Sequence, residues 1–186
     1  MPTEGRTGFA GAAVFFAMRV WTIGHGVRTA EALLATLQRA GVETLVDVRR
    51  YPGSRRNPQF NRAALEASLD SAGIAYRHAE ALGGRLSGEP GAERFACMKA
   101  FASYAARMGT AGWQAALGEA LAEPRPCVMC AETAWTKCHR RLIAELLVAR
   151  GHEVLHLGPD GIERHRLSDD AAVRDGRLYL CGEFVA

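Results

Sequence analysis

The chain contains 186 residues, of which 48% are hydrophobic and 23% are charged. This balance is typical of one globular domain with a sizeable core, and it excludes a disordered or collagen-like chain. No apolar run is long enough to cross a bilayer, so the sequence argues against a membrane-spanning role. A formal net charge of +3 is too small to indicate a nucleic-acid partner by itself.

Arginine and cysteine are the two unusual features of the composition. All but two of the 23 basic residues are Arg. Codon bias in a GC-rich genome accounts for this abundance, so Arg content alone is weak evidence for phosphate binding. The five Cys residues are irregularly spaced and do not indicate a disulfide scaffold. We therefore expect a reducing compartment, with the cytoplasm as the location.

The N-terminal segment differs from the rest of the chain. Residues 9–18 form a short apolar run after Arg6, which is a weak signal-peptide pattern without a clear cleavage site. We interpret residues 1–17 as a disordered extension or a mis-called start. Residues 18–186 are expected to form a single α/β domain.

Strands and helices alternate along the remaining chain. The first part is predicted to contain, in order, strand 20–23, helix 29–40, strand 44–48, helix 61–72 and strand 74–78. The second part is predicted to contain helices 92–108 and 111–122, strand 126–131, helix 138–150, strand 153–157 and a candidate edge strand at 177–180. This alternation predicts a Rossmann-like three-layer α/β domain with a mainly parallel sheet of about five strands.

Polar and reactive residues gather where the predicted strands end. Parallel sheets carry their sites outside the carboxyl ends of the strands. The residues at or just after these ends are His25, Asp47, Arg49, His78, Cys130, Glu132 and His156, with Cys138-His139-Arg140 at the start of the next helix. Each residue alone has an ordinary structural explanation, but together they predict a functional site at this edge.

Cys138 is the candidate nucleophile. A thiol at a helix N-terminus lies at the positive end of the helix dipole, which lowers its pKa and favours the reactive thiolate. Arg140 would act in the same direction. The alternative is a small buried residue that fills the helix–sheet junction. Because His139 is adjacent on the expected helix, its side chain should point away from Cys138, and His25 or His78 would be better placed as the base.

The other cysteines are assigned mainly from strand geometry. Cys127 and Cys130 have the spacing of a metal or redox pair, but residues i and i+3 of a strand point to opposite faces. We therefore assign Cys127 to the core. Cys130 and Cys138 flank one loop, where they could approach each other or share a metal with a His. Cys97 and Cys181 are expected to be structural.

The loop over residues 49–60 is the most distinctive segment. It has four Arg within eight residues and two Pro that stiffen it, and such a loop can bind phosphate bidentately. Tyr51 and Phe60 could stack on a base. The alternative is a solvated loop whose Arg side chains pair with nearby carboxylates. The expected anion-binding residues, including a second loop at 82–85, are Arg49, Arg50, Arg55, Arg56, Asn57, Gly83, Gly84, Arg85 and Arg140.

Standard cofactor motifs are missing from the sequence. No dinucleotide-binding Gly fingerprint follows the first strand, and no phosphate-loop motif occurs anywhere. We therefore expect no cofactor. Glu132 remains as a candidate acid or base, with an ion pair to Arg140 or Arg141 as its structural alternative.

Several of these segments together carry a family resemblance. They are Thr22-Ile-Gly-His25-Gly, Val46-Asp-Val-Arg-Arg-Tyr-Pro52, Ser54-Arg-Arg-Asn-Pro-Gln-Phe-Asn61, Leu82-Gly-Gly-Arg85, Met129-Cys-Ala-Glu132 and Cys138-His-Arg140. From about Trp21 to Leu157 the chain resembles the family called domain of unknown function 488 (DUF488). The resemblance implies a single α/β domain and no established reaction. The family's motif residues fall on His25, Asp47, Arg49, Pro52, Arg55, Asn57, Gly83, Gly84, Arg85, Cys130, Glu132, Cys138, His139 and Arg140.

The leading hypothesis is an enzyme that acts on a phosphate-bearing substrate, either a nucleotide or nucleic acid. Cys138 would be the nucleophile with Cys130 as a partner, His25 the acid or base, and Glu132 an orienting group. Two alternatives stay open. One is a non-catalytic nucleotide- or nucleic-acid-binding module with structural Cys residues, and the other is a metal site that uses Cys130 and Cys138.

Overall fold

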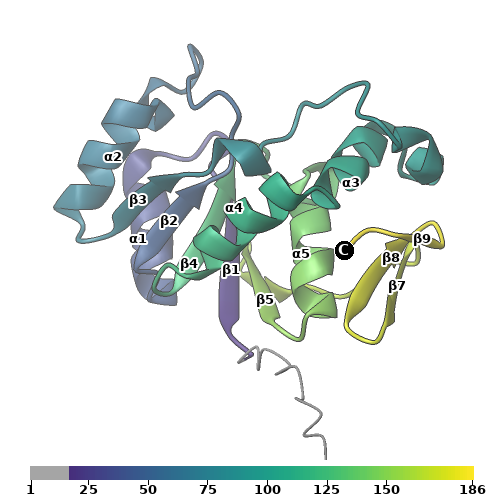
Figure 1. Cartoon of the computed structure of the whole chain (residues 1–186). Coiled ribbons are helices and arrows are strands. Elements are labelled where there is room, and N and C mark those ends of the chain that lie inside the picture. Colours follow the sequence, from purple (N-terminus) through teal and green to yellow (C-terminus); the bar gives the residue numbers. More distant parts are fainter. Residues whose placement is uncertain (1–16) are drawn as a thin grey trace, which may run out of the picture.

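A six-stranded sheet forms the centre of the computed structural model, which describes residues 17–186. Its strands lie in the order β3-β2-β4-β1-β5-β6 (Figure 1). The first five are mutually parallel, and the short β6 runs antiparallel to β5. The strands are β1 (Arg19–Gly24), β2 (Thr44–Asp47), β3 (Ala75–His78), β4 (Pro126–Cys130), β5 (Glu153–Leu157) and β6 (Ile162–Arg164). The predicted Rossmann-like architecture is therefore confirmed, with one antiparallel strand added.

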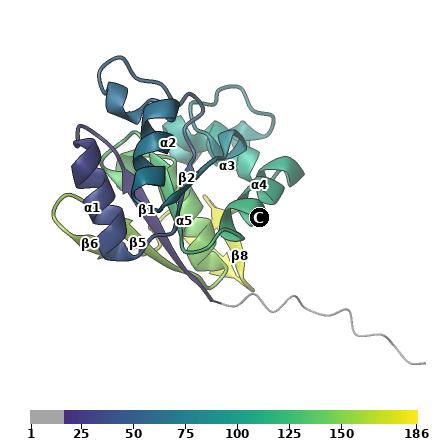
Figure 2. The ribbon, with the colours of Figure 1, turned by 90° about the vertical axis from the view of Figure 1, so that its left-hand side faces the viewer.

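Helices cover both faces of this sheet (Figure 2). Leu33, Leu37, Leu65 and Leu69 pack with one side of the strands, and the residues of the later helices pack with the other. The first face carries α1 (Ala30–Ala40) and α2 (Arg62–Ser71), and the second carries α3 (Ala102–Met108), α4 (Ala111–Leu121) and α5 (Arg140–Ala149). Because each crossover is right-handed, the direction in which the chain moves along the sheet decides which face its helix covers.

Local sequence signals explain where α1 begins and ends. The Thr29 hydroxyl accepts a hydrogen bond from the Ala32 backbone N–H, which satisfies one of the free donors of the first turn. Gly41 ends the helix in the left-handed conformation, at a φ of 67°. None of the described helices is long and apolar enough to span a membrane.

The C-terminal segment forms a second, antiparallel sheet of three strands. These are β7 (Ala171–Arg174), β8 (Arg177–Leu180) and β9 (Glu183–Phe184), with β8 in the middle. The expected edge strand at 177–180 is therefore a strand, but it does not extend the main sheet. Leu178 and Leu180 are buried in the same apolar cluster as α5, which explains why β8 packs there.

The expected helix over 92–108 is broken into two parts. Residues Ala92–Phe101 form irregular 3-10 turns, named η3, and a regular helix starts only at α3. Lys99 has a positive φ of 51°, which no α-helix accommodates. Three shorter 3-10 turns are η1 (Pro58–Phe60), η2 (Glu80–Leu82) and η4 (Trp135–Lys137).

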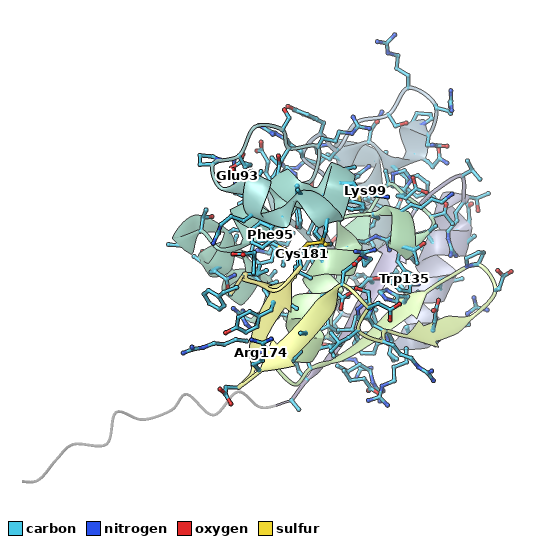
Figure 3. All side chains as sticks on the ribbon, turned by 90° about the vertical axis from the view of Figure 1, so that its right-hand side faces the viewer. Glu93, Phe95, Lys99, Trp135, Arg174 and Cys181 are labelled. Carbon is cyan, nitrogen blue, oxygen red and sulfur yellow. A yellow bond between two sulfur atoms is a disulfide. The ribbon has the colours of Figure 1, made fainter. Side chains whose placement is uncertain are left out.

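A disulfide joins η3 to the C-terminal sheet. Cys97 and Cys181 are bonded across 84 residues, with their Cα atoms 6.1 Å apart. Figure 3 shows Cys181 beside the segment that carries Phe95 and Lys99. The structural role expected for both residues thus takes the form of a covalent link. The cytoplasmic location stays a prediction, and this bond weighs against it because reducing compartments disfavour disulfides.

Candidate functional site

The carboxyl edge of the sheet holds a cavity at a topological switch point. The loops after β1 and β2 lead to helices on one face, whereas the loop after β4, which lies between them, leads to the other. Ligand sites form in the crevice that such divergence opens. The cavity here has a volume of about 430 Å³. Its lining includes His25, Arg49, Arg50, Tyr51, Asn57, Gly84, Arg85, Tyr104, Cys130, Glu132, Lys137, Cys138 and His139.

Two cysteines and one histidine meet at the floor of this cavity. Cys130 is the last residue of β4, and Cys138 lies in extended backbone just before α5. The His139 Nδ1 atom lies 3.9 Å from the Cys130 Sγ and 3.7 Å from the Cys138 Sγ. All three of these atoms lie within 4.8 Å of one another, and all three side chains are buried or nearly so. The structure therefore brings Cys130 next to Cys138 and His139, which follow it by eight and nine positions in the sequence.

The surroundings favour negative charge on Cys138. A hydrogen bond from the Cys130 thiol lowers the pKa of Cys138, burial opposes this, and the nearby His139 and Arg140 lower the pKa further. The pKa of Cys130 is raised by the same hydrogen bond and by burial. These surroundings therefore favour the negative charge on Cys138 and the proton on Cys130. Two cationic or donor groups next to a thiol are the usual cause of such activation.

The expectation that His139 points away from Cys138 is wrong. It rested on helical spacing, but α5 begins only at Arg140, and Cys138 has the extended angles φ −124° and ψ 149°. In this conformation adjacent side chains can converge on one point. His139 is also held by the Tyr104 ring, whose centroid lies 4.9 Å away, and Tyr104 donates a hydrogen bond to the Leu82 carbonyl.

The three floor residues also form a possible metal-ligand set. Two thiolates and an imidazole would leave the fourth position of a tetrahedral zinc ion open toward the cavity. The other nitrogen of His139, Nε2, is buried without a hydrogen-bond partner among the described residues. It stays unpaired both with a metal on Nδ1, as a donor, and with a proton on Nδ1, as an acceptor, so both uses carry this cost. With its proton on Nδ1, His139 donates toward Cys138.

Arg49 and Arg140 are buried and already engaged by protein atoms. The Arg49 guanidinium binds the buried Asp47 carboxylate at 2.6 Å and donates to the Phe60 carbonyl at 2.8 Å. Arg140 donates to the Glu132 carbonyl and, at 3.4 Å, to the Thr22 hydroxyl. Both were predicted to bind anions. The structure uses them to fix the loops that follow β2 and β4.

The rim of the cavity carries three other basic side chains. Arg50, Arg85 and Lys137 are exposed, and no ion pair in the described part of the chain involves them. Arg85 has a positive φ of 60°, which costs an L-residue about 1 kcal/mol. Such strain is typical of functional sites. Arg55 and Arg56 lie on the same loop as Arg50 but do not line the cavity.

Of the remaining predicted residues, some pack beneath the cavity as structural support and others line it. Phe60 is buried and stacks on the His25 ring at 4.4 Å, so it offers no surface to a base, whereas Tyr51 is exposed at the rim. His25 has both ring nitrogens engaged, by the Gly26 carbonyl and by Arg49. Burial lowers the pKa of His25, so its ring is neutral at pH 7. Glu132 lines the cavity with an exposed side chain.

Glycines let the backbone pass close to the site. A Cβ at Gly84 would lie 2.6 Å from the His139 Nδ1 atom, and one at Gly24 would lie 2.8 Å from the Arg140 guanidinium. The Gly83 N–H, expected to bind an anion, donates instead to the Glu80 carbonyl at 2.8 Å. The glycine pair therefore makes room for the imidazole.

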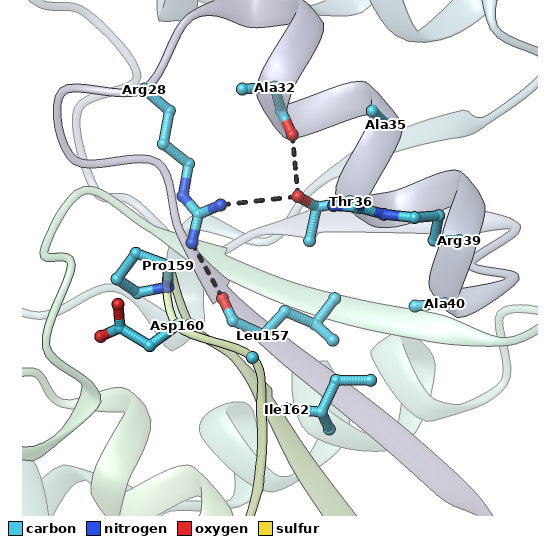
Figure 4. Close-up of a pocket in the computed structure, with 12 residues that line it drawn as sticks. Arg28, Ala32, Ala35, Thr36, Arg39, Ala40, Leu157, Pro159, Asp160 and Ile162 are labelled. Atoms are coloured by element: carbon cyan, nitrogen blue, oxygen red, sulfur yellow. Dashed lines mark hydrogen bonds between the residues drawn. The ribbon is translucent and has the colours of Figure 1, made fainter.

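Two features of the surface escaped the sequence analysis. Tyr104 is buried in the core and also lines the cavity, and its position in the middle of a helix gives no sign of this. A second cavity of about 600 Å³ lies on the other side of β1, between α1 and the turn after β5. Figure 4 shows Arg28 reaching across it to the Leu157 carbonyl and the Thr36 hydroxyl. No cluster of reactive side chains faces this second cavity in the described residues.

Comparison with known proteins gives one match. The family model described as "Domain of unknown function DUF488" matches residues 29–147, a span that includes the loops after β2 and β4 and the start of α5. His25 lies before the matched span. No curated protein and no solved structure matches the chain.

Proposed function

Because the chain belongs to the DUF488 family, whose description names no reaction, we propose a function from the site itself. We propose that the protein is an enzyme in which Cys138 attacks a phosphate-bearing substrate, a nucleotide or nucleic acid, bound in the 430 Å³ cavity. The proposal covers the reaction type only as far as nucleophilic attack by a thiolate.

One observation carries this proposal. The cavity has an activated thiolate at its floor and three basic side chains without carboxylate partners at its rim. The cavity lining carries more basic than acidic side chains, with Glu132 as its carboxylate, and this excess of positive charge favours an anionic substrate and raises its local concentration. Arg50 and Arg85 can each bind a phosphate oxygen pair in the bidentate manner that guanidinium geometry permits.

The neighbouring groups fit distinct roles in such a reaction. The His139 Nδ1–H and the Cys130 thiol hold the Cys138 charge in place until attack, and the released proton stays on Cys130. Glu132 is better placed than His25 to move a proton for the leaving group or for water, because both nitrogens of His25 are occupied. Tyr51 offers an exposed ring to stack on a base.

A binding experiment tests the substrate class. Adenosine monophosphate and a short oligonucleotide serve as probes, titrated against the full chain and followed by calorimetry at two salt concentrations. Replacing Arg50 and Arg85 with Ala should weaken binding by tenfold or more, about 1.4 kcal/mol, and reduce its salt dependence. The matched control replaces Arg55 and Arg56, which lie on the same loop outside the cavity, and should change binding little.

The same titration separates an enzyme from a binding module. Cys138→Ser should retain probe binding while it abolishes any turnover of a substrate found by screening phosphate esters. If wild-type protein binds neither probe, or if the Arg55 and Arg56 replacements weaken binding as much as those at Arg50 and Arg85, the proposed anion site is wrong. Turnover that survives in Cys138→Ser contradicts the nucleophile, whereas probe binding by wild-type protein without turnover of any phosphate ester favours the non-catalytic binding module with structural cysteines.

A further inference from the structure

Cys130 has a chemical role that nucleophilic attack by Cys138 does not use. We propose that Cys130 and Cys138 are a redox modification site, at which a hydroperoxide oxidises Cys138 and Cys130 then closes a reversible disulfide with it. The inference rests on the Cys138 thiolate of the proposed function and adds redox regulation of that same site. The oxidised protein would lose its nucleophile and regain it when a thiol reductant opens the bond.

The positions of the two sulfur atoms support this pairing. They lie within 4.8 Å of each other, on either side of one loop, and a disulfide requires about 2.05 Å. Cys130 is the last residue of β4 and pairs with Gly24 of β1, whereas Cys138 lies before the first residue of α5, so Cys138 is the sulfur that can move. The loop between them, residues 131–137, is exposed along most of its length. Closing the remaining gap therefore needs a shift of this loop and no break in the sheet or the helix.

Access to the sulfurs comes through the cavity. Cys130 and Cys138 both line it, although the surrounding side chains leave them little exposed. A small uncharged hydroperoxide can reach this floor past a rim that selects larger anions. Cys127 offers the contrast, because it is fully buried among residues of the opposite face and cannot take part.

The chemistry balances in two steps. The Cys138 thiolate attacks the near oxygen of the hydroperoxide, an S–O bond forms as the O–O bond breaks, and the alkoxide or hydroxide that leaves takes up a proton. The Cys130 sulfur then attacks the Cys138 sulfenic acid. An S–S bond forms, the S–O bond breaks, and the proton of the Cys130 thiol departs with the hydroxide as water. Two thiols are oxidised to one disulfide, and one hydroperoxide is reduced to an alcohol and water.

Without the second thiol, oxidation would go further. A sulfenic acid that meets no thiol proceeds to sulfinic and sulfonic acids, which ordinary reductants do not reverse. The arrangement therefore predicts that Cys130 protects Cys138 from irreversible oxidation to the sulfinic or sulfonic acid. His139 lies next to both sulfurs and can donate from Nδ1 to the departing hydroxide.

The test treats the full chain with several equivalents of hydrogen peroxide, because the sulfinic acid consumes two, and maps all cysteines by peptide mass spectrometry. Wild-type protein should yield a Cys130–Cys138 linked peptide, lose two free thiols, and recover both after dithiothreitol. Cys130→Ser should instead accumulate sulfinic acid at Cys138, severalfold above wild type, and should not recover. Cys127→Ala, which removes a thiol from the same strand but from its other face, should behave like wild type.

Three outcomes would overturn the inference. One is sulfinic acid at Cys138 in wild-type protein without any linked peptide. Another is equal overoxidation of wild type and Cys130→Ser. The third is protein that carries a stoichiometric metal by elemental analysis and whose two thiols resist both peroxide and alkylation. In the first two cases Cys138 of untreated protein still alkylates as a thiolate, so the proposed function stands. A Cys138 that reacts with neither peroxide nor the alkylating reagent contradicts both proposals.

Discussion

Gly84 is a residue at which a side chain would displace His139 directly. Its backbone passes the His139 ring so closely that a Cβ would come within 2.6 Å of Nδ1. Gly84→Ala should push the imidazole away from both sulfurs, because His139 is the neighbour that must move. The pKa of Cys138 should rise toward that of a free thiol, and its alkylation at pH 6 should slow, as peptide mass spectrometry can measure.

Gly112 provides the matched control for this substitution. It lies in α4 with nothing within 4 Å of the position of a Cβ. Gly112→Ala should leave Cys138 alkylation unchanged and stabilise the protein by about 0.5 kcal/mol, because Ala favours a helix interior over Gly. Equal alkylation rates in Gly84→Ala and wild type would show that the imidazole does not activate the thiol.

The buried Asp47–Arg49 pair yields a prediction about stability. Asp47 is fully buried, and it also accepts a hydrogen bond from the Tyr76 hydroxyl at 2.9 Å. Asp47→Ala should lower the free energy of unfolding by about 3 kcal/mol, because it leaves the Arg49 charge buried without a partner. Denaturation in urea measures this change.

An exposed ion pair serves as the reference for that measurement. Arg19 and Glu153 pair at 2.7 Å, with the Arg19 side chain 54% exposed. Glu153→Gln should cost much less than Asp47→Ala, because solvent screens an exposed ion pair. Similar costs for Asp47→Ala and Glu153→Gln would mean that Arg49 finds another partner or reaches solvent when Asp47 is removed.

The sequence indicates which residue types gather at the site better than it indicates their roles. Of the residues predicted at strand ends, His25, Arg49, Cys130 and Glu132 line the cavity, because parallel strands bring their carboxyl ends level. His78 and His156 do not line it. The roles of Arg49 and Arg140 depend on a buried carboxylate and on backbone carbonyls that only the tertiary fold brings near them. The contact between His139 and Cys138 was not predicted, because the helix was expected to start at Cys138. In the structure α5 begins only at Arg140.

At the scale of elements, the disulfide between η3 and the turn after β8 is the strongest constraint outside the sheet. It joins Cys97 and Cys181, and η3 ends with Ala100 and Phe101, which line the cavity. Cys97→Ser should lower the free energy of unfolding by about 3 kcal/mol, because the unfolded chain gains the freedom of a long loop. Thermal unfolding followed by circular dichroism measures the loss.

The reductant provides the control for this prediction. Dithiothreitol should lower the melting temperature of wild-type protein to that of Cys97→Ser, and it should leave the variant unchanged. A variant as stable as oxidised wild type, or a wild type that does not respond to reductant, would contradict the constraint.

The strands and regular helices could be predicted because their signals are local. The Thr29 cap and Gly41 stop of α1 act within a few residues, and the apolar run of β2 indicates a buried parallel strand. The break of η3 at Lys99 has no such local signal. The second sheet was also missed, because short strands such as β9 form only where β8 already packs against α5.

Across the whole molecule, buried histidines tie stability to pH. His156 lies between the Thr22 hydroxyl at 2.7 Å and the His165 Nδ1 at 3.0 Å, beneath the Trp135 ring. Burial, the neighbouring His165 and the charge of Arg140 lower the pKa of His156 to about 3. The folded protein therefore keeps this ring neutral at pH values at which the unfolded chain protonates it.

The sign of the pH effect follows from this difference. Below the unfolded pKa of about 6.5 the unfolded chain binds more protons than the folded one, so stability falls as the pH falls. The contribution of His156 should approach about 1.4 kcal/mol per pH unit between about pH 6 and pH 4. Urea denaturation of wild type and His156→Gln across this range measures it. The variant should be less stable at pH 7 but should lose less stability on acidification, and parallel curves would contradict the burial of a neutral ring.

The overall topology follows from a few general rules once the elements are known. Right-handed crossovers and a strand order that places β4 between β2 and β1 force the neighbouring loops apart, which creates the cavity. The sequence could predict the edge at which this happens. It could not predict the strand order, and therefore could not show that the β4 loop forms the floor of the site.

The most direct test of the activated thiolate is the pH dependence of Cys138 alkylation by iodoacetamide, with peptide mass spectrometry to locate the label. We predict an apparent pKa well below the roughly 8.5 of a free thiol, with Cys127 unlabelled in the same sample. Cys130→Ala should raise that pKa, because it removes the hydrogen-bond donor. A Cys138 that titrates like a free thiol, or that stays unlabelled at every pH, would contradict the account.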